Sequence, residues 1–98
     1  MTYDTTVELR VGTHCVETVR DAAQMHNTTQ AAVWRSLLSA LPTQQPLSEL
    51  FIPTDNARAK VLVRCSNAQR KRYLIAKAQN DCTAAVLFES VLSAEAVK

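Results

Sequence analysis

The chain has 98 residues, a formal net charge of only +2 and 47% hydrophobic residues. This length allows one small domain, or two small units that share a core, and the small charge means that the molecule as a whole is not a polycation. A single glycine and three prolines argue against a β-sandwich, which needs many tight turns, and no apolar run reaches the ~18 residues of a membrane span.

The first predicted element is a strand over about residues 5–11, because apolar and polar residues alternate there. Its apolar residues are Val7, Leu9 and Val11. A helix is expected over about residues 13–26, with Thr13 as its N-cap. Together these segments predict a half-buried strand that leads directly into a helix.

A second helix is expected after a short turn at Asn27 and Thr28. Thr29 is suited to cap this helix, which ends before Pro42 because the residue before a proline disfavours the helical conformation. Residues 41–59 are bounded by prolines and polar residues and therefore predict a linker. One helical turn docked on the core could be formed there by Leu47, Leu50, Phe51 and Ile52.

The last part of the chain predicts the same three elements again. A strand is expected at about residues 60–65, followed by a helix from residue 66 or 67 to about 80 and a turn at 81–82. The inward residues of this strand are Val61, Val63 and Cys65. Thr83 is suited to cap the final helix.

An offset of 54 residues superimposes the two halves without a gap. Between Val7 and Ala40, nine of 34 positions are identical at this offset, whereas chance gives roughly two or three. The segment TQAAVWRSLLSA is repeated as TAAVLFESVLSA, with Trp34 and Phe88 at the same place. These two aromatic residues are expected either in the core or on a surface where two molecules meet.

One strand–helix–helix unit of about 40 residues has too little apolar surface to fold alone, and its single strand leaves backbone groups unpaired. Two units resolve both problems if their strands pair antiparallel and the four helices pack beneath. The predicted fold is therefore mainly α with a two-stranded antiparallel ribbon. It consists of a first unit at 1–40, a linker at 41–59 and a second unit at 60–98, around one shared core.

This order of elements resembles the ribbon-helix-helix family of DNA-binding proteins, of the Arc and MetJ type. The likeness lies in VELRV and, after a helix, NTTQAAVWRSLLSAL, where the cap, small, aliphatic, Arg and Leu positions are Thr29, Ala31, Val33, Arg35 and Leu37. The second unit departs from the pattern, since Glu89 replaces Arg35 and Leu62 occupies an outward strand position. The resemblance implies a single-chain tandem pseudo-dimer. Tandem units are similar, in architecture only, to certain conjugative-plasmid transfer proteins.

The resemblance also implies that the ribbon enters the major groove of double-stranded DNA. The outward residues predicted to contact bases are Thr6, Glu8, Arg10, Lys60, Leu62 and Arg64. Arg10 and Arg64 are suited to guanine, Lys60 to guanine or phosphate, and Leu62 to a thymine methyl group, while Glu8 either accepts from cytosine or repels phosphate. The alternative is a solvated sheet face without a partner. Because the two ends differ, an asymmetric target is expected.

Phosphate contacts are expected from the N-termini of the second helix in each unit, where N–H groups attract anions. The residues at these ends are Thr28, Thr29, Cys82 and Thr83. The densest positive charge, Arg70-Lys71-Arg72, is predicted either to clamp flanking phosphates or to form a solvated helix face. Tyr73 is expected in the core, because it aligns with Val19.

Charge and cysteine content bear on partner and location. Residues 1–54 contain 3 Lys or Arg and 5 Asp or Glu, which gives a net charge of −2. Residues 55–98 contain 8 Lys or Arg and 4 Asp or Glu, which gives a net charge of +4. An anionic partner should therefore lie against the second half of the chain. The start MTYDTTVELR lacks the apolar core of a signal peptide, and three scattered cysteines predict no disulfide framework. A cytoplasmic protein without a membrane partner is therefore expected.

No enzyme activity, metal or cofactor is expected. The candidate ligands are His14, Cys15, His26, Cys65 and Cys82, and their spacing matches no metal-site pattern. The single glycine also leaves no glycine-rich phosphate-binding loop.

The favoured function is sequence-specific binding of double-stranded DNA, as a transcriptional repressor or as an accessory factor of plasmid or phage DNA processing, with self-association of pseudo-dimers on DNA left open. The rival is a protein-interaction module that keeps the fold without binding DNA, which the acidic first half, Glu8 and the low net charge favour. A third reading, an antitoxin-like protein, requires a toxin-binding tail, and the chain ends shortly after Ala94.

Overall fold

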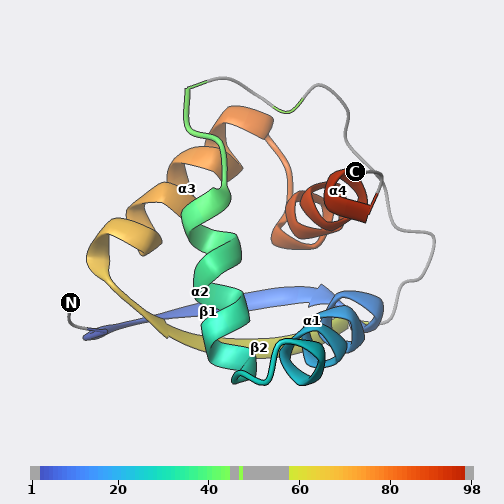
Figure 1. Ribbon diagram of the computed structural model, residues 1–98. Helices are drawn as coiled ribbons and strands as arrows, with labels where there is room; N and C mark the ends of the chain where they lie inside the picture. Colours follow the sequence, from blue (N-terminus) through green and yellow to red (C-terminus); the bar gives the residue numbers. More distant parts are fainter. Residues whose placement is uncertain (1–2, 45–46, 48–57, 97–98) are drawn as a thin grey trace.

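The computed structural model describes residues 3–44, 47 and 58–96. Its elements in chain order are β1 (Thr5–Gly12), α1 (Thr13–Met25), α2 (Gln30–Ala40), β2 (Arg58–Cys65), α3 (Asn67–Asn80) and α4 (Ala84–Ala96) (Figure 1). The prediction of a mainly helical fold with one two-stranded antiparallel sheet is confirmed. None of these helices combines the length and the apolar character that crossing a bilayer requires.

The two strands lie side by side along their whole length and run in opposite directions (Figure 1). Thr5 lies opposite Cys65 at one end of the ribbon, and Gly12 lies opposite Arg58 at the other. β2 thus begins two residues before the predicted start at Lys60, because the alternation of the strand continues through Ala59. This pairing satisfies the backbone groups that either strand alone would leave without partners.

The helices pack on one face of the ribbon, as the alternation of apolar residues predicts. The buried strand residues are Val7, Leu9, Val11, Val63 and Cys65, and Val61 is half-buried against them. α2 packs on β2, whereas α4 packs mainly on β1, so each of these helices covers the strand from the other half of the chain. The core is therefore shared between the two halves.

The helix starts follow the predictions with one exception. Thr29 Oγ1 accepts a hydrogen bond from Ala32 N at 3.1 Å, and Thr83 Oγ1 accepts one from Val86 N at 3.4 Å, which confirms both caps. The prediction of Thr13 as N-cap is wrong, because the N-cap residue is Gly12, which has no side chain that could form a capping hydrogen bond. Gly12 is still paired within the ribbon, so the strand passes into the helix without an intervening residue.

The turns between the helices of each half have the same backbone geometry. Asn27 and Asp81, which are 54 residues apart, both adopt the left-handed conformation, with φ angles of 51° and 47°. Asparagine and aspartate tolerate this conformation better than most residues. The residue after each of them closes the turn onto the preceding helix: Thr28 N donates to Ala23 O, and the equivalent bond joins residues 82 and 77. The sequence repeat is thus also a repeat of local structure.

An aromatic cluster lies at the centre of the core. Trp34 and Phe88 are buried and meet edge to face, with ring centroids 5.5 Å apart, and Tyr73 stacks on Phe88 at 6.0 Å. Of the two expectations for Trp34 and Phe88, the core position is confirmed and the surface position is wrong. The expectation that Tyr73 is a core residue is also confirmed.

Only part of the predicted linker is described. Leu47 is half-buried against the core, and its backbone N–H donates to Asn80 Oδ1 at 2.9 Å. Gln79 Nε2 donates to the carbonyl of Thr43, so the chain after α2 is held against the end of α3. The predicted docking of Leu50, Phe51 and Ile52 lies outside the described residues.

Candidate nucleic-acid interface

The outer face of the ribbon carries the residues that were predicted to contact bases. All six are exposed: Thr6, Glu8, Arg10, Lys60, Leu62 and Arg64. Arg58 continues this face at the end of β2 and is exposed as well. Sequence reasoning missed Arg58 because the strand was expected to start at Lys60, although the alternation of Arg58, Lys60, Leu62 and Arg64 was a signal for it.

Glu8 lies in the middle of this face and contacts two cations. Its Oε1 atom is 3.7 Å from Arg10 Nε and 4.0 Å from Lys60 Nζ. Arg10 lies two residues along the same strand, and Lys60 lies opposite Arg10 on β2. Because these side chains are largely exposed, the ion pairs contribute little to folding stability. The ion pairs nevertheless place Glu8, Arg10 and Lys60 close together, so a partner of the ribbon would contact these three charged groups as one set.

The two ends of the outer face differ in charge. Towards one end, Arg10 lies opposite Lys60 and Arg58 precedes Lys60 on β2, so that three cations are grouped. At the other end, Arg64 lies opposite the uncharged Thr6. The central pair is also unequal, since Glu8 lies opposite Leu62, whose exposed fraction is 63%. A ligand bound along this face would therefore meet different chemistry at each end.

Arg35, on α2, contacts the end of the ribbon that carries Arg64. Its guanidinium Nη1 donates to the carbonyl of Arg64 at 3.3 Å and lies over the ring of Tyr3, 4.2 Å from the centroid. Arg35 is half-buried and links α2 to β2. The family resemblance identified Arg35 as a pattern position but assigned it no contact. No local feature of the sequence indicates that Arg35 forms a hydrogen bond with Arg64, 29 residues further along the chain.

The predicted phosphate-binding residues at the helix N-termini divide into two groups. Thr28, Thr29 and Thr83 are exposed residues, and the hydroxyl groups of Thr29 and Thr83 also cap α2 and α4. Cys82 is half-buried against the core, and its backbone N–H is directed to the carbonyl of Lys77 at 3.5 Å. Its side chain is therefore less exposed than those of the three threonines.

The basic run on α3 is also divided. Arg70 and Lys71 are exposed, as a solvated or phosphate-binding helix face requires. Arg72 is half-buried and lines a polar pocket with Pro42, Thr43 and Gln44, where its Nε atom is buried without a hydrogen-bond partner. Three consecutive residues cannot share one helix face, because successive side chains are about 100° apart around the axis. Arg70 and Lys71 are therefore exposed to solvent, whereas Arg72 lies against the chain that follows α2.

A buried thiol–carboxylate contact joins α1 to α4. Cys15 Sγ donates to Glu89 Oε2 at 2.7 Å, and both residues are buried. Burial, together with the hydrogen bond and negative charge of Glu89, raises the pKa of Cys15 to about 12. Burial also raises the pKa of Cys65. Across residues 3–44, 47 and 58–96, no three His, Cys, Asp or Glu side chains are grouped as metal ligands.

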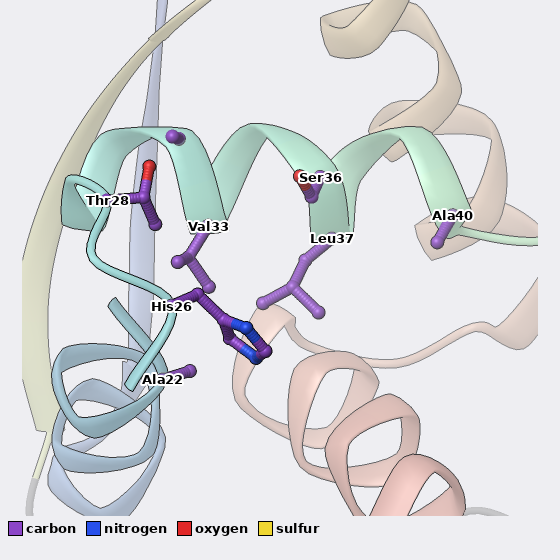
Figure 2. A pocket seen from close by; sticks show the side chains of 8 residues that line it. Ala22, His26, Thr28, Val33, Ser36, Leu37 and Ala40 are labelled. Atoms are coloured by element: carbon purple, nitrogen blue, oxygen red, sulfur yellow. The ribbon is translucent and has the colours of Figure 1, made fainter. Parts of the chain in front are cut away.

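A shallow groove of about 330 Å³ separates the end of α1 from α2. Figure 2 shows the imidazole of His26 below Val33 and Leu37, which project from α2 towards it. The lining is mainly apolar, and the groove contains none of the charged residues of the ribbon face. Its chemistry therefore differs from that of the ribbon.

Comparisons of the chain with protein-family models, with curated proteins and with solved structures found no match.

Proposed function

We propose that this chain is a single-chain tandem ribbon-helix-helix pseudo-dimer that binds double-stranded DNA through the outer face of β1 and β2. The observation that carries the proposal is this exposed face, which presents Arg10, Lys60 and Arg64 on a two-stranded ribbon while the helices cover the other side. A ribbon of this kind fits the major groove, where arginine and lysine donate to guanine O6 and N7.

The register of the ribbon supports the pseudo-dimer. Glu8 lies opposite Leu62, which is its equivalent at the 54-residue offset. Thr6 lies opposite Arg64, which is the equivalent of Arg10. Arg10 lies opposite Lys60, which is the equivalent of Thr6. This relationship is expected when a two-fold axis passes through the central pair, as in a symmetric dimer.

Contacts among the helices follow the same rule. Trp34 meets its own equivalent, Phe88. Cys15 bonds to Glu89, and the equivalent residues also bond to each other, since Gln69 Nε2 donates to Arg35 O at 3.4 Å. A symmetric dimer makes each contact twice unless the contact lies on the two-fold axis, and the two halves of this chain make related contacts with different chemistry.

The proposed DNA site is asymmetric, because the outer face has Arg10, Lys60 and Arg58 towards one end and a single arginine, Arg64, at the other. Thr28, Thr29, Thr83, Arg70 and Lys71 are proposed to contact flanking phosphates. The proposed role is that of a repressor or of an accessory factor in plasmid or phage DNA processing, with pseudo-dimers able to lie side by side on DNA. Three free thiols suit the reducing cytoplasm.

The charge reversal Arg64→Glu tests the proposal. Binding to duplexes with a randomised core should fall by more than tenfold, because one guanine contact is worth about 1–3 kcal/mol and repulsion from DNA adds to that loss. Arg20→Glu on α1 makes the same change in net charge at another exposed position and is the matched control. Equal binding by the wild type and both variants, or equal loss in both variants, would contradict the proposal.

A second candidate function is a protein-interaction module. It is favoured by Leu62, a large apolar side chain that is 63% exposed beside the carboxylate of Glu8. Such a pair suits a protein surface better than a phosphate backbone. For this function, Leu62→Ala should weaken binding to a protein partner while Arg64→Glu has little effect, which is the reverse of the order expected for DNA.

A further inference from the structure

We propose that Glu8 is a specificity-determining residue, which makes one half of the ribbon require a cytosine next to the guanine read by Arg10. This inference rests on the proposed function, since it concerns DNA bound to the outer face of the ribbon. Glu8 selects cytosine at one position of the DNA site, whereas Leu62, the equivalent residue of β2, makes no such selection.

The geometry makes Glu8, Arg10 and Lys60 one unit. A single oxygen of Glu8 lies 3.7 Å from Arg10 Nε and 4.0 Å from Lys60 Nζ, and the side chain of Glu8 is 48% exposed. Both cations therefore lie beside the carboxylate while it still faces outward. Neither contact is short enough to be a strong hydrogen bond, so a ligand can replace it.

DNA binding changes what surrounds the carboxylate. A carboxylate held against the base edges loses part of its hydration, which is unfavourable unless another partner replaces the lost water. If Arg10 and Lys60 turn to guanine O6 and N7, Glu8 loses the cations that neutralise it. A donor must then replace them.

Of the four bases, cytosine and adenine offer amino donors in the major groove. Adenine presents its amino group beside the N7 acceptor, which repels a carboxylate, whereas cytosine presents the N4 amino group without such an acceptor. Two neighbouring base pairs can therefore supply guanine acceptors for Arg10 and a cytosine donor for Glu8. Thymine and guanine present only acceptors, apart from the thymine methyl group, and leave the carboxylate without a partner.

The opposite side of the ribbon centre has no such requirement. Leu62 lies directly across from Glu8 and has neither charge nor hydrogen-bonding groups on its side chain. The preference for cytosine should therefore appear on one side of the site centre and not at the position related to it by two-fold symmetry.

Selection from duplexes with a randomised core tests the proposal with full-length wild type, Glu8→Gln and Glu8→Ala. The wild type should enrich cytosine at one position and bind duplexes altered there about 5- to 100-fold more weakly. Glu8→Gln should shift that position towards adenine, because an amide both accepts from N6 and donates to N7. Glu8→Ala should show no preference there and keep the preferences elsewhere.

Glu17→Gln on α1 is the matched control, since it removes one exposed carboxylate away from the ribbon. It should select the same sequences as the wild type. If Glu8→Gln also selects those sequences and only binds every duplex more tightly, Glu8 acts by repulsion alone and the inference is wrong, while DNA binding stands. If the wild type enriches no sequence and Arg64→Glu has no effect, the proposed function fails together with the inference.

Discussion

Trp34 and Phe88 meet edge to face in the core, with their rings 82° from parallel. They occupy equivalent places in the two halves of the chain, one on α2 and the other on α4. An edge-to-face pair lets the positive edge of one ring meet the negative face of the other. Because neither helix can bury its aromatic residue without the other half, this contact links the stability of the two halves.

Replacement of Phe88 by alanine should destabilise the whole fold. Phe88 is fully buried and also stacks on Tyr73, so the change removes two ring contacts and leaves a cavity, at a cost of about 3–5 kcal/mol. Urea denaturation followed by the fluorescence of Trp34, the sole tryptophan, measures this loss. Met25→Ala, at a side chain that is 80% exposed, should change stability by less than about 0.5 kcal/mol. Similar losses for both variants would contradict the central position of Phe88.

Stability should fall as the pH rises from about 9 to about 12, in part because of Cys15. In this window the unfolded thiol, with a pKa of 9.0, releases its proton, whereas the buried thiol retains it because its pKa is raised to about 12. The unfolded state is therefore favoured progressively, and the contribution of Cys15 is fully present only below pH 9. Cys65, Cys82 and Tyr73 add to the fall, since their pKa values are also raised.

Cys15→Ser isolates this effect, because a hydroxyl group still donates to Glu89 and does not titrate in the same window. Urea midpoints measured at several pH values should decline less steeply for this variant than for the wild type. Parallel declines would mean that the thiol of Cys15 ionises as readily in the folded state as in the unfolded one.

The exposed cations of α3 should affect the salt dependence of DNA binding. Replacement of both Arg70 and Lys71 by alanine should reduce the slope of log K against log salt by about 1–2, because each phosphate contact contributes about 0.9. Arg72→Ala should leave the slope unchanged, since the side chain of Arg72 lies in the pocket beside Thr43. Titrations at two salt concentrations distinguish the variants, and a large change for Arg72→Ala would show that this division of the basic run is wrong.

The ribbon was predictable because its signal is local. Alternation in Val7–Val11 and Val61–Cys65 identifies the buried face of each strand, and a one-residue shift would expose all of these side chains. The same alternation correctly predicts the exposure of Glu8, Arg10 and Arg64. Repetition of the two strands at one offset then indicates that they pair with each other.

Other features depend on contacts that sequence spacing does not determine. The burial of Glu89 against Cys15 joins residues 74 positions apart, and a carboxylate is rarely a core residue. Arg72 is separated from Arg70 and Lys71 by its position around the helix and by the chain that follows α2. The N-cap of α1 is displaced from Thr13 because pairing of the ribbon extends to Gly12, which the sequence does not reveal.

Nuclear magnetic resonance titration of the isotope-labelled protein, with a duplex enriched from the randomised library, locates the DNA-binding surface most directly. The largest shifts should occur at Arg10, Lys60 and Arg64 on the ribbon, with smaller ones at Thr29 and Thr83, where α2 and α4 begin. Shifts confined to the exposed Leu74–Ile75 face of α3, or an unchanged ribbon at saturating duplex, would show that the outer face of β1 and β2 does not bind DNA.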